Sequence, residues 1–359
     1  MLAGAILVTL LDYSWQALST MIATPDELIE KPALRGKAEP PDLLSEVLAH
    51  VRLSGAIFLR GEYAAPWAFD SPESHELAAV LAPGAKRLIL FHIVREGRCW
   101  VSAKGERVEL AAGDVAVLPF ADRHLMGSPG CDKAVPIAEL LPPPPWSGVP
   151  TCRFDGGGEN TGVVCGYLKC DELLFNPALR MLPALFRVRP RPGPGAQWMQ
   201  ACVQYALEET AHRRPGGADL MSRLPELLFI EALRLYAQSV DANARGWLAA
   251  MKDPVVSHAL AHLHAQPAHK WTVTELATRS FTSRSVLDER FRRLLGCSPI
   301  RYLTEWRLQL AADLLRGNRL KLAAVAERVG YESEAAFSRA FRRHAGCSPA
   351  RWRGEIGRH

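Results

Sequence analysis

The side chains with the clearest chemical purpose are the arginines in the last third of the chain. From residue 250 onward there are 19 Lys and Arg against 10 Asp and Glu, a net charge of +9, and the remainder carries −4. A guanidinium forms paired hydrogen bonds with phosphate oxygens and with the major-groove edge of guanine. A basic region on a neutral-to-acidic chain therefore indicates a protein that binds nucleic acid.

A sequence repeat positions these arginines. The stretch FRRLLGCSPIRY begins at Phe291, and fifty residues later the chain reads FRRHAGCSPARW from Phe341. Self-similarity at a fixed spacing indicates a duplicated structural unit. Each unit is predicted to contain two short helices joined by a tight turn, which is the arrangement of a helix-turn-helix.

In the first unit, Thr274 is predicted to cap the first helix and Ser283 the second. Apolar residues of the second helix recur at helical spacing and should face a small core. Its opposite face should read DNA and carries Arg284, Ser285, Asp288, Glu289 and Arg292.

In the second unit, Gly330 stands where the chain must turn sharply, and Ser333 is predicted to cap the second helix. The offset between the copies changes from 49 to 50, so the second turn is one residue longer. Glycine and serine-proline in each Gly-Cys-Ser-Pro suit a helix end followed by a new helix start. The DNA-facing residues here are predicted to be Glu334, Ala335, Ser338, Arg339 and Arg342.

A single helix over Pro299–Arg316 is predicted to join the two units. If it holds the recognition helices about one DNA turn apart, roughly 34 Å, both could enter successive faces of the major groove. Residues 250–355 resemble the DNA-binding domain of the AraC/XylS family of transcription regulators. The matching positions include Leu276-Ala277, Phe291-Arg-Arg, Trp306-Arg307-Leu308, Ala312, Leu314-Leu315, Val325-Ala326, Val329-Gly330-Tyr331, Phe337 and both Gly-Cys-Ser-Pro motifs. This family usually has glycine where the first turn has Phe281. The alternative is a helical bundle that binds a protein.

The N-terminal half is predicted to be a β-barrel or jelly roll, because short apolar or alternating runs are separated by Gly and Pro. The runs are 55–60, 88–94, 98–103, 107–110, 115–118 and 163–168, after a helix over 43–51. Gly113 to His124 reads Gly-x5-Pro-x-Ala-x2-His and resembles the second cupin motif. His92-x3-Glu96 resembles the end of the first, with Leu90 in place of the leading His.

The cupin resemblance implies His92, Glu96 and His124 as a three-ligand set for a divalent metal, or as polar groups of an effector pocket. The imidazoles could equally be internal structural groups. Cys165 is a candidate redox residue, although a buried structural cysteine is the favoured interpretation. The altered first motif argues against the alternative function, a metal-dependent cupin enzyme fused to a DNA-binding domain. No cofactor is therefore expected to be required.

The chain has eight cysteines and no CxxC pair, so reduced thiols in a cytoplasmic protein are expected. The apolar run Met1–Leu11 is too short to cross a membrane, and no membrane association is expected. Two amphipathic helices, 198–213 and 224–239 with Pro225 in the first turn of the second, are predicted. In this family such helices usually form the dimer contact.

The sequence thus predicts an α+β chain with four parts. These are a poorly ordered extension (1–40), a cupin-like sensory domain (41–190), a helical dimerisation element (191–245) and an all-α domain of two helix-turn-helix units joined by a long helix (246–359). The expected function is regulation of transcription through promoter DNA. The expected partners are RNA polymerase, a small effector and a second copy of the chain.

Overall fold

The computed structural model describes residues 42–356 apart from 86, 132, 142–147, 171–175, 213–214, 242–243 and 318–319. The predicted extension over residues 1–40, with its apolar run, lies outside the described residues. Within the described part, no helix is both long enough and apolar enough to cross a membrane.

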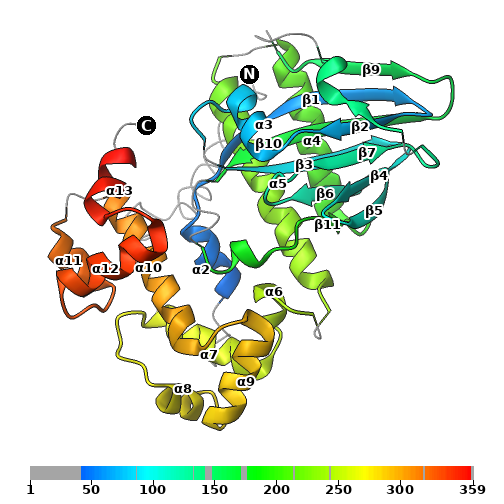
Figure 1. Ribbon diagram of the computed structural model, residues 1–359. Coiled ribbons are helices and arrows are strands. Elements are labelled where there is room, and N and C mark those ends of the chain that lie inside the picture. The colour runs from blue at the N-terminus through cyan, green and yellow to red at the C-terminus, as the bar shows by residue number, and fades with distance from the viewer. Residues whose placement is uncertain are drawn as a thin grey trace, which may run out of the picture. The chain divides into compact units, whose positions relative to one another are not determined.

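In the N-terminal half, the residues that the structure describes form two β-sheets (Figure 1). The first sheet has the order β11 (Phe186–Val188), β6 (Val115–Leu118), β3 (Leu88–Glu96), β10 (Asn160–Lys169), β1 (Ser54–Ala64) and β9 (Thr151–Asp155). The second has the order β5 (Glu106–Ala111), β4 (Arg98–Ala103), β7 (His124–Gly127), β2 (Ala68–Ser71) and β8 (Val135–Pro136). The cupin-like arrangement is confirmed, but the strands form two sheets and not one closed barrel.

Strand β3 shows how the layers stack. Successive side chains of a strand point to opposite faces. Leu88, Leu90 and Val94 belong to the core between the two sheets. Ile89, Phe91 and Ile93 belong to a second core on the other face of the sheet, shared with helices α4 (Pro194–His212) and α5 (Gly217–Ser239). Because β3 is buried on both faces, its sequence is an apolar run without alternation.

The predicted strand runs fall within β1, β3, β4, β5, β6 and β10, and α2 (Leu43–Ala49) fits the predicted first helix. The remaining strands were not predicted. They have two to five residues each, which is too short for an alternating pattern to stand out. Helix α3 (Ser74–Leu81) was also not predicted.

Helix α5 differs from its prediction. It begins at Gly217, so Pro225 lies inside the helix and not in its first turn. Proline has no N–H for the carbonyl of Met221 four residues earlier, which normally ends a helix. Here Met221 and Leu224 both pack against the core that α5 shares with the first sheet, and this burial keeps the turns before Pro225 helical.

The described residues of the C-terminal part form eight helices: α6 (Trp247–Ala250), α7 (Pro254–Ala265), α8 (Val273–Arg279), α9 (Arg284–Leu295), α10 (Pro299–Gly317), α11 (Leu322–Arg328), α12 (Glu334–Ala345) and α13 (Pro349–Ile356). The linking helix, α10, is confirmed. So are the caps at Ser283 and Ser333, and the left-handed glycines that end α9 and α12. The cap of α8 is Thr272 and not Thr274, because the hydroxyl of Thr272 accepts the N–H of Glu275 at 3.1 Å.

The two units turn with the same backbone and different residues. Phe281 and Gly330 occupy equivalent positions, with φ of +55° and +83°. The residue that follows donates its N–H to an equivalent carbonyl in each unit. Thr282 donates to Ala277 at 3.0 Å in the first unit, and Tyr331 donates to Ala326 at 2.8 Å in the second. A Cβ on Gly330 would lie 2.7 Å from the backbone of Ala268, whereas the side chain of Phe281 is 87% exposed. Only the first turn therefore has room for a side chain.

We expect Gly330→Ala to lower the free energy of unfolding by at least about 2 kcal/mol. Left-handed strain of roughly 1–2 kcal/mol would add to the overlap with Ala268. Phe281→Gly should leave the free energy unchanged or raise it, because glycine removes the same strain at an exposed position. Urea denaturation followed by circular dichroism measures both. A larger loss for Phe281→Gly than for Gly330→Ala would contradict this account.

Candidate functional site

Helix α9 presents the first set of predicted DNA-reading side chains to solvent. The hydroxyl of Ser283 accepts the N–H of Val286 at 3.3 Å and starts the helix. Its inner face is held by Leu287, Phe291, Leu294 and Leu295, which are all buried. On the opposite face, Asp288 is half-buried and the other four predicted residues are exposed. Arg292 donates to Asp288 at 2.7 Å, so part of the charge on this face is already paired.

Helix α12 presents the second set in the same way. Ser333 accepts the N–H of Ala336 at 3.2 Å, and Phe337, Ala340 and Phe341 fix the inner face. Ser338 is half-buried, and Glu334, Ala335, Arg339 and Arg342 are exposed. The exposed face of α12 thus offers two arginines one turn apart, a spacing suited to a base edge and a neighbouring phosphate.

Arg307 of α10 joins the two units. Its Nε donates to the carbonyl of Pro267 at 2.6 Å, and its Nη2 donates to the carbonyl of His269 at 2.8 Å. These carbonyls belong to the loop before α8, and the same loop lies against Gly330 in the turn of the second unit. Burial lowers the pKa of Arg307. This role of Arg307 was not predicted; the available signal was a charged residue beside Trp306 within the apolar pattern of the linking helix.

A buried histidine lies where the first unit meets the N-terminal part. His264 is 7% exposed and stacks on Trp306 with ring centroids 4.1 Å apart. Its Nε2 lies 2.8 Å from the hydroxyl of Tyr302, and its Nδ1 lies 3.4 Å from a carboxylate oxygen of Glu46 in α2. Burial lowers the pKa of His264. The stack thus joins α7 to α10, and Glu46 joins α2 of the cupin-like part to α7.

His92 and His124 meet between the two sheets. His92 comes from β3 in the first sheet and His124 from β7 in the second, so the two imidazoles face each other across the space between the sheets. Their Nε2 atoms are 3.0 Å apart, and the Nδ1 of His92 is 3.0 Å from the Sγ of Cys165 on β10. The Nδ1 of His124 lies 3.0 Å from the carbonyl of Asp122. All three side chains are buried.

The Asp122 carbonyl fixes the protons of this cluster. A carbonyl only accepts, so Nδ1 of His124 carries hydrogen, and its Nε2 accepts from the Nε2–H of His92. The Nδ1 of His92 then accepts the thiol hydrogen of Cys165. Burial lowers the pKa of His124 to about 4. Burial, followed by the nearby His124, lowers that of His92 well below its ordinary value. Every polar atom of the cluster is therefore satisfied in the neutral state.

Glu96 does not join the two imidazoles. It is exposed at the end of β3, and four residues of a strand span about 13 Å. Across the described residues, no group of three His, Cys, Asp or Glu side chains could hold a metal ion. The three-ligand set implied by the cupin motifs is thus not assembled. Burial also raises the pKa of the Cys165 thiol, which disfavours the thiolate that oxidant chemistry needs.

Comparisons with known proteins agree with this architecture. Residues 42–238 match a cupin family, and residues 276–355 match a helix-turn-helix domain family. An AraC-like transcription regulator of Streptomyces lividans is 34% identical over 280 residues, covering 74% of this chain and 88% of that protein. The HTH-type transcriptional regulator AlkR of Acinetobacter baylyi is 28% identical over 313 residues, covering 83% of this chain and 94% of AlkR.

A solved structure, the DNA-binding domain of AdpA in complex with a target DNA, is 34% identical to this chain. The matched region covers 28% of this chain and 91% of the AdpA domain, with a TM-score of 0.27. The matched domains define a helix-turn-helix transcription regulator with a cupin domain. The chain belongs to the AraC family of transcription regulators.

The buried imidazoles predict a specific pH dependence. The pKa of His124 is about 4 in the folded protein, whereas an unfolded imidazole takes up its proton near pH 6.5. Between these values the unfolded chain binds more protons, so stability is complete above about pH 6.5 and falls as pH falls toward 4. At pH 5 this one residue should lower the free energy of unfolding by about 2 kcal/mol.

Urea denaturation at pH 8 and pH 5 measures the effect. His124→Gln should lose less stability between these two pH values than the wild type, whatever its stability at pH 8. His75→Gln is the matched control, because His75 is exposed on α3. Equal losses in His124→Gln and the wild type would show that His124 is not buried in its neutral form.

Proposed function

We propose that this regulator reads a promoter site with α9 and α12 in successive faces of the major groove. One observation carries the proposal: two helices with the same capping present polar and basic faces from units that share α10. The hydrogen bonds of Arg307 to Pro267 and His269 favour a fixed separation between the units. Fixed units suit a site of defined spacing, and the net charge of +9 from residue 250 onward suits the phosphate backbone.

The cupin-like part is proposed to sense a small effector. The neutral state of the Cys165 cluster favours an effector over thiol oxidation as the signal. Contacts at the end of α2 offer a route to the DNA-binding part. The Nδ1 of His50 lies 2.9 Å from the carboxylate of Asp313, and the backbone carbonyl of His50 accepts the side-chain N–H of Gln309 at 3.0 Å. A ligand that favours one arrangement of these contacts would shift the population of DNA-binding states. The protein would act in the cytoplasm on RNA polymerase and would not be an enzyme.

We expect Arg339→Ala to weaken binding to the promoter site by about 1–3 kcal/mol, because Arg339 stands exposed in the middle of α12 and can reach a base edge. Arg351→Ala is the control, since Arg351 is also exposed but lies in α13, beyond the unit. Fluorescence anisotropy with the full chain and DNA from its own promoter region measures both. Losses below about 0.5 kcal/mol for both variants would contradict the assignment of α12.

We further propose that α4 and α5 form the contact between two copies of the chain. Seven large apolar residues of the described part are markedly exposed, and four of them lie on these helices. Trp198 and Tyr205 are seven residues apart on α4, and Leu220 and Leu227 are seven apart on α5. Each pair therefore shares one helix face. Such clustering of exposed apolar side chains is typical of a protein interface.

Leu227→Glu should shift the protein from dimer toward monomer, because it places a charge at the centre of an apolar contact. Size-exclusion chromatography with light scattering measures the mass at several concentrations. Val80→Glu introduces the same charge at a similarly exposed position on α3 and should leave the dimer intact. If both variants have the wild-type mass, α5 is not the contact.

A further inference from the structure

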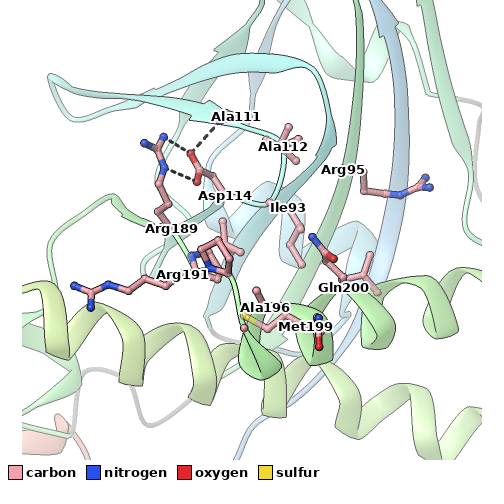
Figure 2. A pocket seen from close by; sticks show the side chains of 18 of the residues that line it. Ile93, Arg95, Ala111, Ala112, Asp114, Arg189, Arg191, Ala196, Met199 and Gln200 are labelled. Atoms are coloured by element: carbon pink, nitrogen blue, oxygen red, sulfur yellow. Dashed lines mark hydrogen bonds and ion pairs between the residues drawn. The ribbon is translucent and has the colours of Figure 1, made fainter.

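A cavity of about 900 Å³ lies outside the inter-sheet core, between the first sheet and helix α4 (Figure 2). Its walls are the end of β3 at 93–95, the β5–β6 turn at 111–115, the loop at 189–193, and the inner face of α4. The volume is within the range of small-molecule sites. The cavity is separate from His92, His124 and Cys165, which do not line it.

The floor of the cavity is apolar. Ile93 enters from β3, and Met199 and Val203 come from α4. Their exposed fractions are 8%, 4% and 3%, so each side chain is held in the core and presents only an apolar edge to the cavity. Figure 2 shows Ile93 above Met199 and Ala196, with Gln200 beside them.

The charge around the cavity is positive. Asp114 is the one acid among the described residues that line it, and its carboxylate is occupied. Arg189 donates to both oxygens at 2.9 and 2.7 Å, and the N–H of Ala111 donates at 3.0 Å. Arg95 and Arg191 are exposed and lie on opposite sides of the cavity in Figure 2, with their guanidinium groups directed outward, so that a turn of either long side chain brings its charge to the rim. Within the described part of the chain, no acidic side chain pairs with either of them.

We propose that this cavity binds a small organic acid, with its apolar body on Ile93, Met199 and Val203 and its carboxylate at the rim, within reach of Arg95 or Arg191. A guanidinium matches a carboxylate through two parallel hydrogen bonds, which a neutral or cationic head group cannot form. Helix α4 would gain ligand contacts on its inner face.

The position of α4 gives this site a regulatory consequence, which rests on the proposed function. The residues of α4 that line the cavity lie on one face of the helix. Trp198 and Tyr205 lie on the opposite face, away from the core. A ligand that orders the inner face of α4 therefore stabilises the helix that carries the proposed dimer contact. Binding itself can be measured without assuming any effect on DNA.

Calorimetric titration of the full chain with octanoate, octylammonium and 1-octanol tests the proposal, because the three probes share one apolar body. We expect octanoate to bind at least about tenfold more tightly than octylammonium. The double variant Arg95→Met/Arg191→Met should lose about tenfold in octanoate affinity and keep its 1-octanol affinity. Arg98→Met removes an exposed arginine from β4, outside the cavity, and should match the wild type.

Two filling variants test the location. Ala196→Phe on α4 and Ala112→Phe on the β5–β6 turn should each abolish octanoate binding while keeping the wild-type circular dichroism spectrum. Absence of octanoate binding to the wild type, equal affinity for octylammonium, or full binding by a folded filling variant would each overturn the proposal. Promoter affinity of the same samples without ligand separates this outcome from a failure of DNA binding itself.

Discussion

Burial of α10 on two sides is the constraint on which the DNA-binding part depends. Tyr302, Leu303 and Trp306 belong to the core of the first helix-turn-helix unit. Leu308, Ala311, Ala312 and Leu315 belong to the core of the second. Separating either unit from α10 would expose apolar surface to water, at a free-energy cost of roughly 25 cal/mol for each Å² exposed. Helix α10 is therefore part of both units, and their separation follows from its length.

The two units share one backbone conformation at their turns, and the contact between them requires different residues there. The second turn lies against Ala268, so its left-handed residue must be glycine. The first turn faces solvent, so the same conformation is filled by Phe281 at the cost of strain. Arg307 ties the loop beside this contact to α10 and gives the two recognition helices a common frame.

In the cupin-like part, the buried polar cluster and the cavity suited to a ligand lie in different places. The buried imidazoles and thiol satisfy one another in a neutral chain that joins the two sheets, and such a network specifies how the sheets face each other. Among the described residues, Arg95 and Arg191 have no acidic partner and stand at opposite sides of the cavity beside α4, whose floor is apolar. An effector is therefore expected between the sheet and the helix, and not at the cupin motif.

The sequence by itself determined what depends on neighbouring residues: the serine caps of α9 and α12, their inner and outer faces, the helix between the units and the sharp turn at Gly330. These features follow from hydrogen bonds and periodicity within about one turn of helix. Tertiary structure decided what depends on residues far apart in the chain. It placed His124 opposite His92, left Glu96 in solvent and paired Asp114 with Arg189. It also kept α5 helical before Pro225, because packing against the sheet outweighs the hydrogen bond that proline cannot form.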